Sequence, residues 1–180
     1  MIRVDAAAVN YTDVFLVANA YQNSIPVPFV PGSDFAGTVV EVGDRVLMWS
    51  PGDRVFGSHP SGAFAEFVRV GPDELFRSPT GMHPRNAAGL RVAYATAMDV
   101  LRWVLEVQAG QWLVVTGAAG GVGLAAIDLA TRLGVRIIAC ARGIDRLALC
   151  GERGAEVLVD PSTRIRGQSF GRSLVRARTP

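Results

Sequence analysis

The clearest chemical signal in the chain is the run Gly-Ala-Ala-Gly-Gly-Val-Gly at residues 117–123. Its spacing Ala118-x-Gly120-x-x-Gly123 matches the glycine fingerprint of dinucleotide-binding loops, with alanine at the first position. At Gly120 no Cβ stands between the backbone and a diphosphate, and Gly123 lets a helix pack closely on a strand. Free N–H groups and the positive dipole end of that helix attract phosphate. The run predicts a dinucleotide-binding loop; a tight turn without a ligand is the alternative.

Two arginines after the loop bear on which nicotinamide cofactor would bind. An NAD site usually has an acid about 20 residues past the loop, where it bonds the ribose 2′-hydroxyl. Here the segment reads Ala139-Cys-Ala-Arg142, without an acid. Arg142 and Arg146 can pair with a 2′-phosphate, unless they are only solvated residues at a helix terminus. Asp145 is the one acid that could instead bond the ribose 2′-hydroxyl and so favour NADH. We expect it in the first turn of a helix, where an acid suits the helix dipole.

These residues favour NADPH, with NADH as the less favoured cofactor. The predicted cofactor-binding residues are Ala118, Ala119, Gly120, Gly121, Val122, Gly123, Arg142 and Arg146.

The elements around the loop alternate between strand and helix. We expect a strand at 112–116, a helix at 121–133, a strand at 135–141, a helix at 144–153 and a strand at 156–159. Gly134 is a natural helix stop. This alternation predicts a right-handed parallel α/β sheet.

The preceding part of the chain has a different pattern. Short apolar stretches at 2–9, 35–42, 55–57 and 63–70 are separated by proline- and glycine-containing turns, which indicates a small β-barrel. Residues 11–18 predict one short helix. Pro84 suits the first position of a helix, and residues 85–105 have the composition of one or two helices.

Composition excludes several classes of protein. With 49% hydrophobic and 19% charged residues, the chain is expected to fold, and a net charge of +2 does not indicate nucleic-acid binding. Two cysteines are too few for a disulfide framework, so a cytoplasmic protein is expected. The N-terminus does not resemble a signal peptide. The apolar stretch 112–130 contains too many glycines for a membrane helix, so no membrane association is expected.

The last segment, residues 161–180, is basic and without apolar periodicity. It contains five arginines and no acidic residue. We expect a disordered tail, with an RNA- or membrane-binding arm as the alternative.

Several short motifs converge on one family. They are Ala7-Ala-Val-Asn-Tyr-Thr-Asp13, Pro28-Phe-Val-Pro-Gly-Ser-Asp34, Ala36-Gly-Thr-Val-Val-Glu-Val-Gly43, Pro51-Gly-Asp-Arg-Val55, Gly62-Ala-Phe-Ala-Glu-Phe67 and Val92-Ala-Tyr-Ala-Thr-Ala97. With the glycine loop, they resemble the medium-chain dehydrogenase/reductase superfamily, in its zinc-independent quinone oxidoreductase, or zeta-crystallin-like, branch. The resemblance runs from Ile2 to Asp160. It implies a GroES-like barrel domain at 1–93, a partial Rossmann domain at 94–160 and a tail at 161–180.

The resemblance also implies a site without metal. Zinc-using relatives have Cys where this chain has Asn10, and Gly-His-Glu where it has Gly32-Ser33-Asp34, so the expected zinc ligands are missing. His59 and His83 lack ligand-like spacing and are expected in surface turns. Asp34, in place of the family's glutamate, is expected to have a structural role.

Three residues are predicted at the substrate by resemblance. Asn10 lines the pocket, where its amide can donate to a carbonyl oxygen; alternatively it only caps the following helix. Tyr21 matches a pocket tyrosine whose hydroxyl can donate, or it is plain packing. Thr96 falls on the helix beneath the nicotinamide. Phe15 and Met98 stand where bacterial quinone reductases tend to carry tyrosine, which predicts a more apolar pocket.

The function that follows is NADPH-dependent hydride transfer to a quinone or an α,β-unsaturated carbonyl compound. Relative to the family, one β-hairpin before Ile2 and the strands after Asp160 are missing, so we expect a truncated gene product. The edge strand of the family's dimer would be absent, and the first Rossmann strand would be an open edge available for self-association. The alternatives are an inactive nucleotide-binding fragment and an interaction protein that acts through its basic tail.

Overall fold

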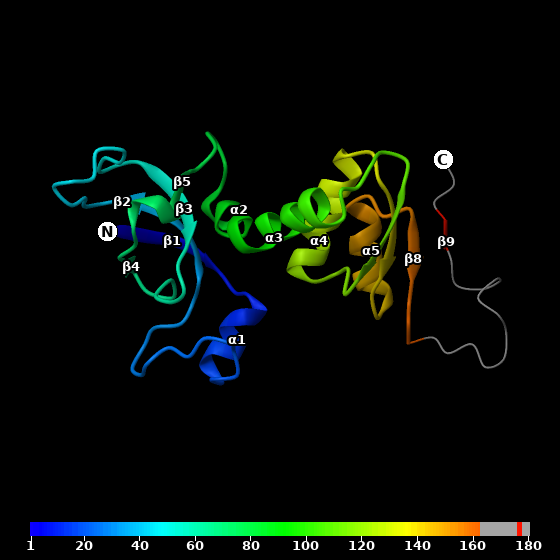
Figure 1. Cartoon of the computed structure of the whole chain (residues 1–180), viewed down its shortest axis with the longest axis horizontal. Coiled ribbons are helices and arrows are strands. Elements are labelled where there is room, and N and C mark those ends of the chain that lie inside the picture. Colours follow the sequence, from blue (N-terminus) through cyan, green and yellow to red (C-terminus); the bar gives the residue numbers. More distant parts are fainter. Residues whose placement is uncertain (163–175, 178–180) are drawn as a thin grey trace. The chain divides into compact units, whose positions relative to one another are not determined.

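The computed structural model describes residues 1–162 and 176–177. Contacts divide the chain into two compact units, Met1–Val92 and Ala93–Pro180 (Figure 1). Each unit has its own buried hydrophobic residues. The predicted fold class is confirmed: an antiparallel sheet comes first, and the start of a parallel α/β sheet follows. The prediction of a tail over 161–180 lies almost entirely outside the described residues.

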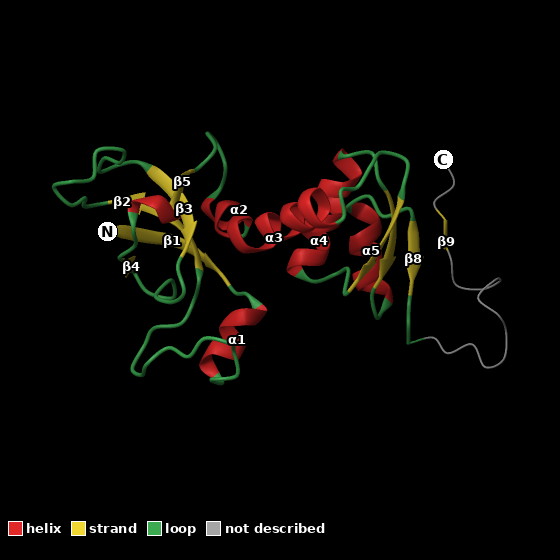
Figure 2. Ribbon diagram, in the orientation of Figure 1, coloured by secondary structure: helices red, strands yellow, loops and turns green. Residues whose placement is uncertain are grey.

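The first unit is built on a five-stranded antiparallel sheet (Figure 2). Its strands are β1 (Ile2–Ala8), β2 (Asp34–Val39), β3 (Arg54–Ser58), β4 (Phe67–Val68) and β5 (Leu75–Arg77), in the order β4-β1-β2-β3-β5. Ile2, Phe35, Val39 and Val55 are buried in its core. Together these strands bring the end of β1 beside the start of β2, where Ala8 is opposite Asp34.

Two strands differ from the sequence prediction. The strand predicted at 63–70 is reduced to β4, because the Ala63 and Phe64 amides donate to the carbonyls of Gly32 and Pro31 rather than to a neighbouring strand. The short strand β5 was not predicted. It approaches β3 so closely that a Cβ at Gly57 would lie 2.4 Å from the Glu74 carbonyl oxygen.

The helices of this unit are short. They are α1 (Tyr11–Val17), the 3₁₀ turn η1 (Pro72–Glu74) and α2 (Pro84–Ala88). Pro84 begins α2, as predicted, and the His83 ring accepts a hydrogen bond from the Arg85 amide at 3.2 Å. Ala87 and Ala88 of α2 are buried against Ala36.

A helical stretch with two π-helical turns leads into the second unit. The π-helical turn η2 (Leu90–Tyr94) is followed by α3 (Ala95–Asp99) and the π-helical turn η3 (Val100–Val104). Residues 85–105 were predicted to be one or two helices. Within the second unit, the Tyr94 hydroxyl donates to Asp128 at 3.1 Å, and Leu101 is buried in the core.

A parallel sheet with its crossover helices forms the rest of the second unit. Its elements are β6 (Trp112–Thr116), α4 (Gly121–Arg132), β7 (Arg136–Cys140), α5 (Ile144–Glu152) and β8 (Val157–Val159). Each agrees with its predicted range to within two residues. Gly134, with φ of 73°, follows α4 as the predicted stop. A two-residue strand, β9 (Arg176–Ala177), pairs antiparallel with β8.

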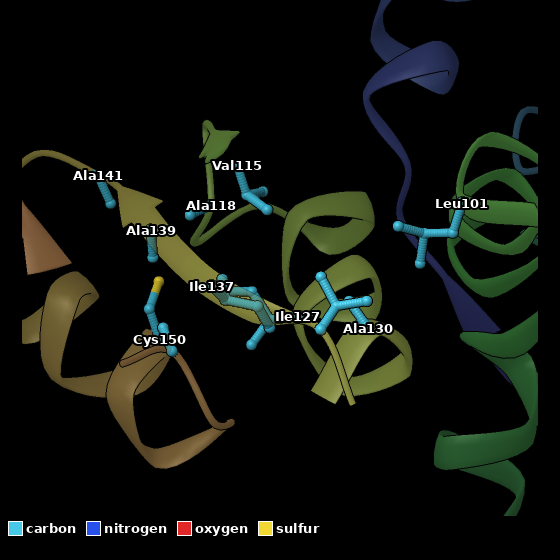
Figure 3. Packing of buried hydrophobic residues seen from close by; sticks show 11 residues of the cluster. Leu101, Val115, Ala118, Ile127, Ala130, Ile137, Ala139, Ala141 and Cys150 are labelled. Atoms are coloured by element: carbon cyan, nitrogen blue, oxygen red, sulfur yellow. The ribbon is translucent and has the colours of Figure 1, made fainter. Parts of the chain in front are cut away.

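Helices cover one face of this sheet. Val115, Ile137 and Ala139 belong to the same buried cluster as Ile127 of α4 and Cys150 of α5 (Figure 3). Alternate residues of β6 are exposed instead, Trp112 by 46% and Val114 by 58%. Among the described residues, no helix is long and apolar enough to cross a membrane.

Candidate functional site

The loop between β6 and α4 is held by two hydrogen bonds of its own backbone. The Ala118 amide donates to the Cys140 carbonyl of β7 at 3.1 Å, and the Gly120 amide donates to the Gly117 carbonyl at 2.9 Å. Gly117 has φ of 60°, which favours glycine. The loop therefore turns sharply from the end of strand β6 into helix α4, and Ala118, which is fully buried, anchors it.

The first turn of α4 presents backbone N–H groups without acceptors. Gly120 is the N-cap residue of this 12-residue helix. Within the described part of the chain, the amides of Gly121, Val122 and Gly123 have no hydrogen-bond acceptor. The next amide, that of Leu124, already donates to the Gly120 carbonyl at 2.8 Å. Such a set of free N–H groups at the positive end of a helix suits a phosphate or diphosphate.

The glycines of the loop serve different needs. A Cβ at Gly123 would lie 2.6 Å from the Gly117 carbonyl oxygen and 2.7 Å from that of Ala118, so internal packing alone requires glycine there. At Gly120 the nearest such contact, to the Gly117 oxygen, is 3.3 Å, and at Gly121 it is 4.0 Å, to Ala93 Cβ. Packing does not require glycine at Gly121, and the space beside it is open.

The two predicted arginines lie near the carboxyl end of β7 and the start of α5. Arg142 is the second residue after β7, and Arg146 is in the first turn of α5; both are exposed. Neither forms an ion pair with another described side chain. Asp145 is in the first turn of α5, as predicted. The Gly143 amide, between the two arginines, donates to Asp160 at 3.0 Å. Hydrogen bonds from Ser162 and Gly143 lower the pKa of Asp160, and the nearby charge of Arg142 adds to this effect.

In the first unit, Asn10 is part of a buried polar cluster. Its side-chain nitrogen Nδ2 lies 3.1 Å from Asp34 Oδ2 and 3.4 Å from Ser33 Oγ. The Ser33 hydroxyl donates to Asp13 Oδ1 at 3.0 Å, and Asp13 Oδ2 accepts from the Asn10 backbone amide at 2.7 Å. Asp13, Ser33 and Asp34 are buried, while Asn10 is half-buried. Asn10 is the N-cap residue of α1, but its side chain makes no capping hydrogen bond.

Asp34 is the most deeply buried member of this cluster. Its Oδ2 also accepts the Val92 amide at 3.1 Å, and its Oδ1 has no hydrogen-bond partner in the described chain. Burial raises the pKa of Asp34; it outweighs the hydrogen bonds from Asn10 and Val92, and the nearby charge of Asp13 adds to it. The carboxyl group therefore connects the segment before α1, strand β2 and the turn η2.

The other two predicted substrate residues stand apart from this cluster. Tyr21 is in the loop after α1 and is 37% exposed. Thr96 is an exposed residue of α3. Neither hydroxyl has a hydrogen-bond partner among the described residues. Asn10 and Tyr21 belong to the first unit and Thr96 to the second.

No group of three or more His, Cys, Asp or Glu side chains that could hold a metal ion gathers anywhere in the described residues. His83 is the exposed N-cap residue of α2. His59 is not a simple turn residue, because its ring lies 2.7 Å from Glu74 Oε1 in a half-buried pair. Cys140 and Cys150 are both free thiols.

Sequence reasoning did not identify Asp13 and Ser33 as neighbours of Asn10. One local signal was available for Asp13, because an acid three residues after an N-cap residue commonly reaches back to the backbone amide. For Ser33 no local signal exists, since its contact with Asn10 spans 23 positions.

Comparisons with known proteins agree with this architecture. The family model described as alcohol dehydrogenase GroES-like domain matches residues 1–97. A quinone oxidoreductase of Mus musculus is 35% identical over 156 residues, which are 86% of this chain and 47% of that protein. A quinone oxidoreductase-like protein 2 homolog of Nematostella vectensis is 35% identical over 88% of this chain and 44% of its own length.

Solved structures give the same picture. The quinone oxidoreductase of Thermus thermophilus, described together with its NADPH complex, has a TM-score of 0.77 at 32% identity and is matched over 87% of this chain and 49% of its own. A mycobacterial protein complexed with NADPH has a TM-score of 0.82 at 34% identity, over 88% and 49%. The chain thus spans about half the length of the relatives it matches.

The matched domain, the relatives and the order of an antiparallel sheet followed by a parallel one lead to one assignment. The chain belongs to the medium-chain dehydrogenase/reductase superfamily, in its quinone oxidoreductase branch.

Proposed function

We propose that the protein is an NADPH-dependent oxidoreductase that reduces a quinone or an α,β-unsaturated carbonyl compound without zinc. The observation that carries the proposal is the set of free amides at Gly121, Val122 and Gly123, which open α4 directly after strand β6. We assign residues 1–93 to a substrate domain and 94–160 to a cofactor domain. The two compact units support this division.

The residues present fit a dinucleotide phosphate. The free amides bind the diphosphate, and Gly120 leaves the backbone open to it. Arg142 and Arg146 bind the 2′-phosphate, because both are exposed cations that form no salt bridge with a described side chain; Arg142 in addition lies near the charge of Asp160. Two structures similar to this chain were described with NADPH, which supports the choice of cofactor.

When bound, the nicotinamide supplies a hydride to the substrate. The protein has to orient the substrate and donate a hydrogen bond to the oxygen that gains negative charge. We assign this donation to the Tyr21 hydroxyl, which has no partner in the described chain. The Asn10 amide nitrogen, which the sequence suggested as a donor, already donates to Asp34 and Ser33. Thr96 is assigned to the nicotinamide side of the site.

Zinc independence is part of the proposal because of the side chains present. Zinc sites in proteins use Cys, His and carboxylate ligands. At the two positions where zinc-using relatives carry Cys and His, this chain has Asn10 and Ser33. These two side chains already hydrogen-bond to carboxylates in the cluster around Asp34.

A second function is favoured by one observation. The free amides of the glycine loop can bind a diphosphate by themselves, whereas the Asn10 amide nitrogen, the donor suggested by the sequence, is already used within the protein. This alternative is a nucleotide-binding or interaction module.

Calorimetric titration with NADPH, with NADH as the control, tests the proposal together with a turnover assay. We expect NADPH to bind more tightly than NADH and to be oxidised in the presence of a quinone or an enone. Binding without oxidation of any quinone or enone would select the module. A folded sample that binds neither dinucleotide would rule out the oxidoreductase and the nucleotide-binding module, and would leave only an interaction module.

A further inference from the structure

The hydrogen bonds around Asn10 fix which way its carboxamide points. Both Asp13 oxygens accept hydrogen bonds, one from the Asn10 backbone amide and one from the Ser33 hydroxyl. Because Ser33 uses its only proton toward Asp13, its oxygen can only accept from Asn10. The group of Asn10 that faces Ser33 must therefore be the NH₂.

Asp34 holds the same nitrogen from a second side. Its Oδ2 accepts from Asn10 Nδ2 at 3.1 Å and from the Val92 amide at 3.1 Å. Both protons of the Asn10 amide are thus used inside the protein. The remaining polar atom, Oδ1, has no described partner, and it is not among the buried side-chain atoms that lack one. It therefore reaches solvent and is free to accept a hydrogen bond.

We propose that Asp34 and Ser33 are positioning residues that turn the Asn10 carboxamide so that its oxygen, not its N–H, faces the ligand. The site at Asn10 then selects a ligand group that donates a hydrogen bond, such as the hydroxyl of a hydroquinone. This inference rests on the proposed function for the identity of the ligand class. It reverses the role suggested by the sequence, in which the Asn10 amide donates to a carbonyl oxygen.

Side-chain NMR of the full ¹⁵N-labelled chain tests the orientation without requiring turnover. The Asn10 NH₂ signals are assigned with the Asn10→Asp variant, and exposed Asn23 is the internal control. We expect the Asn10 protons to exchange with water at least about tenfold more slowly than those of Asn23, because one or two hydrogen bonds protect them. The protection should persist in Asp34→Asn, which keeps an acceptor oxygen, and be lost in Asp34→Ala. Exchange of the Asn10 protons as fast as that of Asn23 would overturn the proposal.

A matched pair of ligands tests the selection. Hydroquinone and 1,4-dimethoxybenzene differ in their ability to donate, and each is titrated while the Asn10 signals are observed. We expect hydroquinone to bind about three- to tenfold more tightly, the value of one hydrogen bond. Equal affinity, or no effect of hydroquinone on Asn10, would contradict the selection. If Asp34→Ala does not fold, Ser33→Ala and the wild-type ligand pair still decide.

The same spectra separate this inference from the proposed function. Binding of NADPH is followed at the backbone amides of Gly121, Val122 and Gly123. A protected Asn10 with a hydroquinone preference, combined with unaffected glycine-loop signals, would refute the proposed cofactor and leave the inference intact. Shifted loop signals combined with an unprotected Asn10 would support the proposed cofactor and refute the inference about Asn10.

Discussion

Replacing Gly123 by alanine tests whether the loop and α4 have to approach as closely as described. The new Cβ would lie 2.6 Å and 2.7 Å from the carbonyl oxygens of Gly117 and Ala118. Both atoms belong to the backbone, so no side-chain rotation relieves the contact. Ala118 is also tied to Cys140 by its amide, so relief has to disturb either that bond or the first turn of α4.

The expected cost follows from two opposing effects. Forcing one extra carbon into a packed site usually costs about 1–3 kcal/mol. Replacing glycine by alanine inside a helix returns up to about 1 kcal/mol. The net loss is therefore about 0–3 kcal/mol, and the middle of that range, about 1–2 kcal/mol, lowers Tm by about 4–15 °C for a unit of this size. The loop amides move as well, so NADPH binding should weaken.

Gly121→Ala is the matched control in the same helical turn. Its Cβ would meet only Ala93 Cβ, at 4.0 Å, so it should keep or raise Tm. Thermal unfolding followed by circular dichroism compares the two variants with the wild type. If Gly123→Ala proves as stable as Gly121→Ala, the close approach of loop and helix is refuted.

Three further predictions concern charged groups. The double variant Arg142→Ala, Arg146→Ala should bind NADPH about 10- to 100-fold more weakly and NADH as tightly as the wild type, as measured by calorimetry. Equal losses of affinity for both dinucleotides would contradict the assignment of these arginines to the 2′-phosphate. Because burial raises the pKa of Asp34, folding favours its protonated form, and the stability of the protein should decline as pH rises through the folded pKa. Asp34→Asn should remove this decline in urea unfolding measured from pH 4 to 7. An unchanged pH profile in this variant would argue against the raised pKa. For Glu74, burial is outweighed by hydrogen bonds from His59 and the Gly71 amide, which lower its pKa. Glu74→Gln should therefore lower the free energy of unfolding at pH 7, and the loss should become smaller as pH falls through the folded pKa of Glu74. A loss that does not depend on pH would argue against the interaction of Glu74 with His59.

The second unit could be predicted largely from sequence because its signals are local. The apolar strand β6, the glycine loop and the amphipathic helix α4 follow each other in 21 positions, and Gly134 marks the end of the helix. The apolar residues of each strand and helix repeat with the period of that element, and each glycine is explained by its local conformation or packing. The loop residues of the candidate site could be predicted from sequence for the same reason.

The first unit was harder to predict because its short elements depend on distant partners. Strand β5 exists because Gly57 lets the backbone at Glu74 approach. The segment before β4 turns away because its amides bond to Pro31 and Gly32. The cluster around Asn10 joins three segments, and no local period signals that Ser33 and Asp34 determine the orientation of its amide.

The central claim is that the first turn of α4 binds a diphosphate through its free backbone amides. The most direct measurement is an NADPH titration of the ¹⁵N-labelled chain that follows the amide signals of Gly121, Val122 and Gly123. The account predicts large, saturable shifts at these three positions and small ones at Gly134, at the other end of the helix. Saturating NADPH that leaves the three signals unmoved in a folded sample would contradict it.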